Sequence, residues 1–167
     1  MQAEKKVFVI MGVSGCGKST LGMALAEHLK IPFFDGDDFH PKENIEKMTQ
    51  GIPLGDSDRK PWLARLNQIA AKHKDKGAVI ACSALREAYR ESLQKGLEKK
   101  VVWVYLFGSY PELLGRVSER ASHYMPATLL QSQFDTLEPP PYGIHVPVSL
   151  SVEQAISKIL EDPNTSG

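Results

Sequence analysis

Residues 12–19 have the types and the spacing needed to bind a polyphosphate. They read GVSGCGKS, which matches the phosphate-binding loop pattern GxxxxGK[ST]. Glycines let such a loop bring backbone N–H groups against phosphate oxygens, Lys18 can reach the outer phosphates, and the Ser19 hydroxyl can hold a metal ion. We therefore expect these residues to form a loop that binds ATP or GTP. The alternative is an ordinary glycine-rich turn without a ligand. The residues expected to contact it are Gly12, Val13, Ser14, Gly15, Cys16, Gly17, Lys18, Ser19 and Thr20.

A cluster of acidic residues follows the second apolar segment, where residues 35–41 read DGDDFHP. In open parallel sheets, ligands bind outside the carboxyl ends of the strands, which is where this cluster is expected. Acids there could orient metal-bound water and accept a proton from an attacking hydroxyl. The alternative is a solvated acidic turn that caps the helix after Pro41. The nearby phosphate-binding loop favours a functional role for at least one acid.

Two arginines are candidates for binding an anionic substrate. The planar guanidinium of Arg59 suits a carboxylate, although a surface ion pair with Asp56 or Asp58 is the alternative. Arg86 follows the third apolar segment and could reach an anionic group at the same edge of the sheet. Arg90 lies four residues further on and is expected to be structural.

A second basic pair, Arg116 and Arg120, leads into a polar segment of the kind that closes over ATP. Arginines in such a lid stabilise charge on the transferring phosphoryl group, and closure excludes water. The alternative is an ordinary solvated helix face. The lid is expected at about residues 120–137.

Apolar strands alternate with amphipathic helices along the whole chain, which predicts an α/β fold with a mainly parallel sheet. The strands are expected at residues 7–11, 32–35, 78–82, 101–107 and 144–150. The helices are expected at about residues 18–30, 42–49, 60–76, 85–95 and 109–122, within 122–133, and after Ser151, with fraying from residue 162. We expect one domain spanning residues 1–167.

Composition narrows the class of protein. The 20 basic and 20 acidic side chains balance, so no global field favours nucleic acid or a membrane surface. Apolar runs all fall well short of the roughly 20 residues of a membrane span. The two cysteines give neither a disulfide framework nor a zinc site, and the first strand begins too early to leave room for a signal peptide. A cytoplasmic enzyme is expected.

Several motifs in one order are similar to those of a known family. After the phosphate-binding loop come DGDDFHP at residues 35–41, NIEKM at 44–48, GIPL at 51–54, DRKPWL at 58–63, CSAL at 82–85, HYM at 123–125, SQF at 132–134 and LE at 137–138. Over about residues 7–138 the chain resembles the small gluconate kinases (gluconokinases) of the nucleoside-monophosphate-kinase-like P-loop group. This combination of motifs is far more specific than the loop alone.

The resemblance implies an activity and a fold. It implies transfer of the ATP γ-phosphate to the 6-hydroxyl of D-gluconate, with Mg²⁺ as the metal ion. It also implies a three-layer P-loop kinase fold, with a five-stranded parallel sheet in the order 2-3-1-4-5 flanked by helices, a lid, and a helical substrate-binding segment at about residues 36–60. The resemblance further implies a homodimer.

The resemblance also implies roles for single residues. The loop residues would hold the phosphates and Mg²⁺, with Asp35 near the metal through a water molecule. Asp37 would engage the substrate hydroxyl, and Arg116 and Arg120 would belong to the lid and contact ATP. The expected catalytic residues are Lys18, Asp37 and Arg120, and the expected gluconate contacts are Asp37, His40, Arg59 and Arg86.

Two other functions remain open from the sequence. One is a related small kinase for shikimate or a nucleoside monophosphate. Shikimate kinases have similar acids after strand two, but they place a Gly-rich turn after strand three, where this chain reads ACSAL at residues 81–85. The other is a nucleotide-binding sensor that transfers nothing, although a sensor needs no substrate base.

Overall fold

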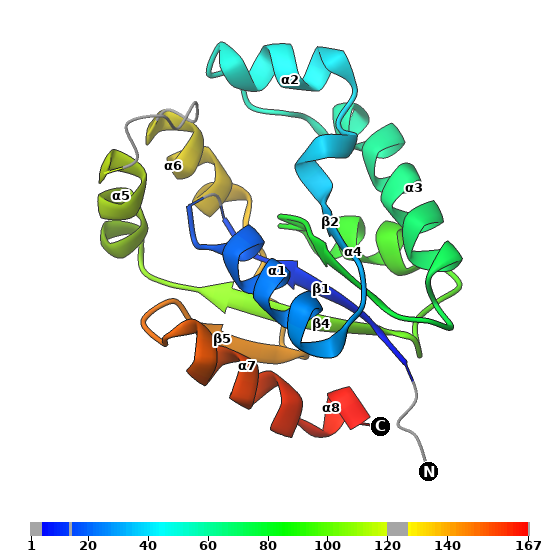
Figure 1. Ribbon diagram of the computed structural model, residues 1–167. Helices are drawn as coiled ribbons and strands as arrows, with labels where there is room; N and C mark the ends of the chain where they lie inside the picture. Colours follow the sequence, from blue (N-terminus) through cyan, green and yellow to red (C-terminus); the bar gives the residue numbers. More distant parts are fainter. Residues whose placement is uncertain (1–4, 14, 120–126, 167) are drawn as a thin grey trace.

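One parallel sheet with helices on both faces forms the body of the protein (Figure 1). The computed structural model describes residues 5–13, 15–119 and 127–166. The elements are β1 Val7–Met11, α1 Lys18–Leu29, β2 Phe33–Asp35, η1 Gly36–Phe39, α2 Lys42–Thr49, α3 Asp56–Lys72, β3 Ala78–Ala81, α4 Glu87–Gln94, β4 Val101–Phe107, α5 Tyr110–Glu119, α6 Ala127–Thr136, β5 Ile144–Pro147, α7 Val152–Glu161 and α8 Pro163–Ser166. None of the helices in the described ranges has the length and apolar character needed to cross a membrane.

The strand order is β2-β3-β1-β4-β5, and every neighbouring pair is parallel, as expected. The central strand β1 is buried along its whole length and pairs with β3 and β4. Its side chains alternate between two apolar layers. Phe8 and Ile10 pack with α1 and α7 on one face, whereas Val7 and Val9 pack with α3 and α4 on the other. The three-layer α/β fold is therefore confirmed.

Helix α3 begins four residues earlier than expected, at Asp56 instead of Lys60. The carboxylate of Asp58 accepts a hydrogen bond of 2.8 Å from the Gly55 backbone N–H and so closes the first turn. This acceptor stabilises a start upstream of Pro61, which lies inside the helix. The earlier start places Arg59 within the helix, where its position is fixed by the helical backbone.

The end of the chain also differs from expectation. Strand β5 ends at Pro147 and a turn follows, because the Leu150 N–H bonds the Pro147 carbonyl at 3.2 Å. Residues 163–166, expected to fray, form the short helix α8. The Asp162 side chain accepts from the Asn164 N–H at 2.9 Å and holds this last turn.

The sheet brings three loops to one edge. The segments after β1, β2 and β3 all leave the sheet at its carboxyl ends, where ligands bind in folds of this class. Figure 1 shows α2 standing beyond this edge on one side, with α5 and α6 on the other. The residues expected to do chemistry are mostly in these segments.

Candidate active site

The loop after β1 depends on glycines at two places. A Cβ atom on Gly12 would lie 2.5 Å from the Leu106 carbonyl oxygen, so only glycine fits beside β4. Gly17, with φ of 97°, turns the chain into α1 in the left-handed region. The Gly12 N–H also bonds the Ser83 carbonyl at 3.3 Å, which links this loop to the segment after β3.

Lys18 lies at the start of α1 and folds back over the loop. Its Nζ atom donates to the Val13 carbonyl at 3.0 Å, and the side chain is half-buried. The thiol of Cys16 is buried beneath the loop, and burial raises its pKa, so it packs as a neutral thiol. Thr20 is exposed in the first turn of α1, and Ser14 lies outside the described residues.

A hydroxyl and a carboxylate meet between α1 and β2. Ser19 Oγ donates to Asp35 Oδ2 at 3.0 Å, and the Asp37 backbone N–H donates to Asp35 Oδ1 at 3.0 Å. Mg²⁺ accepts oxygen ligands of these types and keeps several waters beside nucleotide phosphates. Within the described ranges no three His, Cys, Asp or Glu side chains gather as in an all-protein metal site. The Ser19–Asp35 pair is thus the place that fits the expected ion.

Asp37 is positioned by close packing of η1 against the sheet. A Cβ atom on Gly36 would lie 2.4 Å from the Ala81 carbonyl oxygen, so glycine allows η1 to touch the end of β3. Trp62 Nε1 of α3 donates to the Gly36 carbonyl at 2.7 Å and also holds this turn. The Asp37 side chain remains 59% exposed. A rigid turn therefore carries a solvent-accessible carboxylate.

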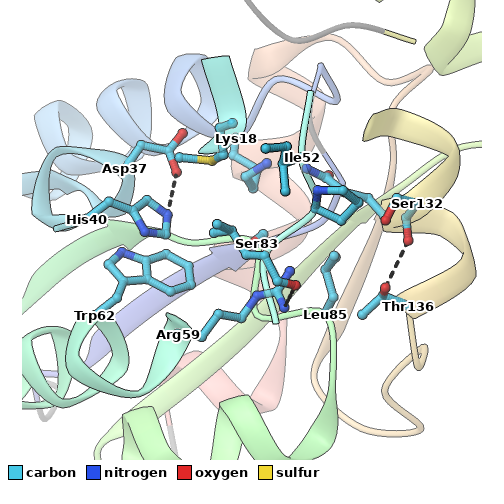
Figure 2. A pocket seen from close by; sticks show the side chains of 14 residues that line it. Lys18, Asp37, His40, Ile52, Arg59, Trp62, Ser83, Leu85, Ser132 and Thr136 are labelled. Carbon is cyan, nitrogen blue, oxygen red and sulfur yellow. Dashed lines mark hydrogen bonds and ion pairs between the residues drawn. The ribbon is translucent and has the colours of Figure 1, made fainter. Parts of the chain in front are cut away.

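A pocket joins the phosphate-binding loop to the segments around it. Figure 2 shows the lining side chains converging from η1, α3, α6 and the loop after β3. The lining residues are Lys18, Asp37, His40, Met48, Ile52, Pro53, Leu54, Arg59, Trp62, Ser83, Leu85, Ser132, Gln133 and Thr136. Four expected site residues, Lys18, Asp37, His40 and Arg59, are thus brought together.

His40 forms part of one wall of this pocket. Its ring stacks on Trp62, with centroids 4.0 Å apart and an interplanar angle of 17°. Its Nε2 atom lies 3.8 Å from Asp37 Oδ1. Burial, together with the positive charge of Arg59, lowers the pKa of His40 to about 4. His40 is therefore a neutral imidazole at neutral pH.

Arg59 is held on the pocket wall by neutral groups. Its Nη1 atom donates to the Leu54 carbonyl at 2.7 Å and to the Tyr89 hydroxyl at 3.0 Å. The guanidinium carbon lies 4.9 Å from the centre of the Tyr89 ring. Asp58 instead pairs with Lys47 at 3.0 Å. The Arg59 side chain lines the pocket, and the two partners named here, a carbonyl and a hydroxyl, leave its positive charge unneutralised.

The other two arginines after β3 have different surroundings. Arg86 is exposed at the start of α4, and its Nη1 atom lies 3.9 Å from Asp56 Oδ2. Arg86 is not one of the described residues that line the pocket. Arg90 is buried and donates to the Ala84 carbonyl at 2.7 Å and to the Glu138 carbonyl at 2.8 Å. Arg90 is structural, as expected.

The expected lid is only partly described. Arg116 on α5 donates to the Val148 carbonyl at 2.8 Å and so links α5 to the loop after β5. Arg120 lies outside the described residues. Helix α6 places Ser132, Gln133 and Thr136 against the pocket, opposite η1 and α3.

Several lining residues were not singled out from their chemistry. Ile52, Leu54 and Trp62 were noted only as parts of motifs. Ser83 and Leu85 flank Ala84, whose φ of 44° lies in the left-handed region that favours glycine. The motif CSAL at residues 82–85 marked this segment in the sequence. The shape of the turn could not be predicted from it, because Ala84 adopts a backbone conformation that is rare for alanine.

Together these groups can carry out phosphoryl transfer to an alcohol. Lys18, an accessible carboxylate and an arginine share one pocket, with a Ser–Asp pair of the oxygen ligands that Mg²⁺ accepts beside it. A carboxylate can accept the proton of an attacking hydroxyl, and a fixed arginine can bind an anionic end of the same molecule. The pocket therefore fits a small acid that also carries hydroxyl groups.

Comparison with known proteins identifies the family. A family model described as shikimate kinase matches residues 14–136. A probable gluconokinase of Xenopus tropicalis is 44% identical over 93% of this chain and 90% of its own length, and the thermosensitive gluconokinase of Escherichia coli (strain K12) is 44% identical over 92% and 83%. A solved gluconokinase from Sinorhizobium meliloti 1021 has a TM-score of 0.86 at 40% identity, covering 95% of this chain and 91% of that chain. The chain belongs to the gluconokinase family of P-loop kinases.

Proposed function

We propose that this chain transfers the γ-phosphoryl group of ATP to the 6-hydroxyl of D-gluconate, giving 6-phospho-D-gluconate and ADP. Its relatives described as gluconokinases support the reaction, and the pocket supports the choice of substrate. One observation carries the proposal: Lys18, Asp37 and Arg59 line the same pocket. Gluconate has a carboxylate at one end and a primary hydroxyl at the other. The carboxylate suits the positive charge of Arg59, and the hydroxyl can donate its proton to Asp37.

In the proposed reaction, Asp37 accepts the proton of the 6-hydroxyl as its oxygen attacks the γ-phosphorus, and ADP leaves with the bridging oxygen. The accessible position of Asp37 supports this role. Lys18 would leave its contact with the Val13 carbonyl and bind the phosphate oxygens. Arg59 and His40 would contact gluconate, and Arg86 would be an outer contact for its carboxylate.

We propose Mg²⁺ as the metal ion, held by Ser19 directly and by Asp35 through water. The 3.0 Å contact between these two side chains supports a shared ion. Mg²⁺ would neutralise charge on the β- and γ-phosphates. Activity should be lost in excess chelator and restored by added Mg²⁺. The loop residues expected from the sequence, together with Thr20, would bind ATP.

The remaining parts of the proposal concern larger units. Arg116 and Arg120 would act from a lid at about residues 120–137, and residues 36–60 would form the substrate-binding segment of a single kinase domain over residues 1–167. Resemblance to gluconokinases supports a homodimer, which light scattering can test. The use of ATP and two buried free cysteines support a cytoplasmic enzyme. The balance of 20 basic and 20 acidic side chains supports the absence of nucleic-acid and membrane partners.

A coupled assay of ADP formation tests the proposed function. The panel would contain gluconate, other aldonic acids, shikimate and nucleoside monophosphates, each with ATP and Mg²⁺. We expect the highest kcat/KM with gluconate, and phosphorus NMR of the product should show a phosphate ester on carbon 6. Turnover with shikimate and none with gluconate would contradict the proposal, and so would ATP binding without transfer to any acceptor.

A further inference from the structure

Asn44 lies behind His40, one helical turn further along the chain. It is 2% exposed, and its side-chain nitrogen Nδ2 has two partners. Nδ2 lies 2.8 Å from the Asp58 backbone carbonyl oxygen and 3.1 Å from His40 Nδ1. No expectation from the sequence gave this asparagine a role in the site.

The two partners determine which way the amide points. A backbone carbonyl oxygen can only accept, so the atom of Asn44 facing Asp58 must be the NH₂ group. One of its two hydrogens goes to that carbonyl, which leaves the other for His40 Nδ1. Nδ1 must then present a lone pair. In a neutral imidazole the remaining hydrogen is on Nε2.

We propose that Asn44 is a positioning residue that holds His40 in the Nε2–H tautomer, so that His40 serves the site as a hydrogen-bond donor and not as a base. This inference rests on the proposed function for the identity of the bound substrate. The Nε2 atom faces the Asp37 carboxylate at 3.8 Å, a separation longer than a direct hydrogen bond. A substrate hydroxyl between them would accept from Nε2–H and give its own proton to Asp37.

The groups around His40 agree with a neutral donor. Trp62 covers one face of the ring, and the positive charge of Arg59 opposes protonation. Asp37 and Lys18 are the other charged groups that line the pocket, and they lie on the side of His40 away from Trp62 (Figure 2). Since its only lone pair is occupied by Asn44, His40 cannot compete with Asp37 for the proton. The site thus separates one donor from one acceptor.

The tautomer can be measured without any turnover. In ¹⁵N-histidine-labelled protein at pH 7.5, long-range ¹H–¹⁵N correlation spectra distinguish the protonated from the unprotonated ring nitrogen, and loss of one signal in His40→Gln assigns the residue. We expect Nε2 protonated and Nδ1 unprotonated. An Nδ1–H tautomer, or a doubly protonated ring, would overturn the inference. Because this result does not depend on the substrate, it can stand or fall separately from gluconate kinase activity.

Exchanging the amide for an acid tests the role of Asn44. In Asn44→Asp the new carboxylate cannot donate, so His40 should become protonated at Nδ1. We expect kcat/KM for gluconate to fall about 10- to 100-fold, as when outer hydrogen-bond partners of a site are lost, with KM for ATP within about twofold. The matched control is Asn67→Asp on α3, which removes amide bonds to the Leu93 and Lys95 carbonyls. It should leave the His40 spectrum and the gluconate kinetics unchanged.

Two changes at His40 separate a donor from a base. His40→Gln keeps an N–H donor close to the position of Nε2, whereas His40→Leu keeps none. We expect the glutamine variant to retain at least about ten times more kcat/KM for gluconate than the leucine variant, a difference of about 1.4 kcal/mol. Equal and severe losses in both variants would overturn the donor role. If Asn44→Asp fails to fold, these variants and the wild-type spectrum still decide the question.

Discussion

At the scale of single residues, three neighbouring acids differ in what surrounds each carboxylate. Both oxygens of Asp35 accept hydrogen bonds, from Ser19 Oγ and from the Asp37 N–H. Asp37 lines the pocket, and Asp38 is exposed and lies outside the pocket lining that the structure describes. The Asp35 carboxylate is therefore held between Ser19 and the backbone, whereas the Asp37 carboxylate, which is 59% exposed, lies where a bound substrate could reach it. Asp37 is therefore the proposed base.

Replacing this carboxylate should stop the chemistry while leaving the fold. For Asp37→Asn we expect kcat to fall about 10³-fold, within the range for loss of a general base, with little change in KM for ATP. Steady-state kinetics and a thermal melt by circular dichroism measure the two effects. Asp38→Asn is the matched control and should remain active. Near-normal kcat in Asp37→Asn would show that Asp37 is not the base.

Arg59 should affect gluconate binding more than ATP binding. Removing its guanidinium in Arg59→Ala should raise KM for gluconate about 10- to 100-fold, since a charge-assisted hydrogen bond contributes about 1.5–3 kcal/mol. KM for ATP should change by less than about threefold. Arg65→Ala removes an arginine of the same helix that lies over the Phe39 ring outside the pocket lining, and should alter neither constant. An unchanged KM for gluconate in Arg59→Ala would exclude a substrate contact.

At the scale of elements, the substrate-binding segment depends on how α2 attaches to α3. Lys47 of α2 bonds both carboxylate oxygens of Asp58 at 3.0 Å, and Asn44 bonds the carbonyl of the same residue at 2.8 Å. Asp58 in turn accepts from the Gly55 N–H. One residue near the start of α3 therefore closes its first turn and anchors α2. His40 precedes α2 and Arg59 lies on α3, so this junction links the segments that carry the two residues to the pocket.

Removing the charge of Asp58 should weaken this junction in a pH-dependent way. The hydrogen bond from Gly55 and the ion pair with Lys47 lower the pKa of Asp58 below its usual 3.8. A lowered carboxyl pKa stabilises the fold above pH 3.8, and this contribution is lost as the pH falls through the lowered value. We therefore expect Asp58→Asn to lower the urea midpoint of unfolding at pH 7. The difference in urea midpoint between the variant and wild type should become smaller below pH 3.8.

The same variant should raise KM for gluconate, because α2 and α3 would no longer be held at a fixed spacing. Glu98→Gln is the control, since Glu98 also accepts from a backbone N–H, that of Gly96 at 3.0 Å, but lies outside the pocket lining in the described structure. It should leave KM for gluconate unchanged. A gap between Asp58→Asn and wild type that stays constant with pH would contradict the proposed role of the carboxylate charge.

At the scale of the whole molecule, Arg90 joins segments that are far apart in the sequence. It is 1% exposed and bonds the Ala84 carbonyl after β3, the Glu138 carbonyl after α6 and the Tyr142 hydroxyl before β5. It also pairs with Glu87 at 3.1 Å. These bonds satisfy its buried charge and fix the turn at Ala84 beside the pocket. Among the described residues, Arg90 thus connects the segments after β3 and α6 to the segment before β5.

A shorter cation at this position should destabilise the whole fold. Lysine cannot reach the same set of acceptors, so Arg90→Lys should lower the free energy of unfolding by about 3 kcal/mol, as expected when a buried charge loses partners. Urea unfolding at pH 7 measures this change. Arg86→Lys, at an exposed arginine of the same segment, should change stability by less than about 0.5 kcal/mol. Similar effects for the two variants would contradict the bracing role of Arg90.

The local pattern of the sequence predicted most of the fold. The bounds of β1, β4 and α2 agree with expectation to the residue, because apolar runs and helical periodicity depend on near neighbours. The start of α3 was wrong, since the Asp58 carboxylate outweighed the barrier expected from Pro61. The strand order came from the family resemblance, and the structure confirms it.

By itself the sequence determined the parallel α/β fold and the phosphate-binding loop, because each depends on residues close together in the chain. Only the tertiary structure decided which side chains share the pocket. It left Arg86 beside Asp56, placed Ser83 and Ser132 in the lining of the same pocket as Lys18, and stacked Trp62 on His40. Such contacts join segments whose spacing is set by packing across the sheet. Hydrogen-bond direction, such as that from Asn44 to His40, is likewise fixed only when both partners are in place.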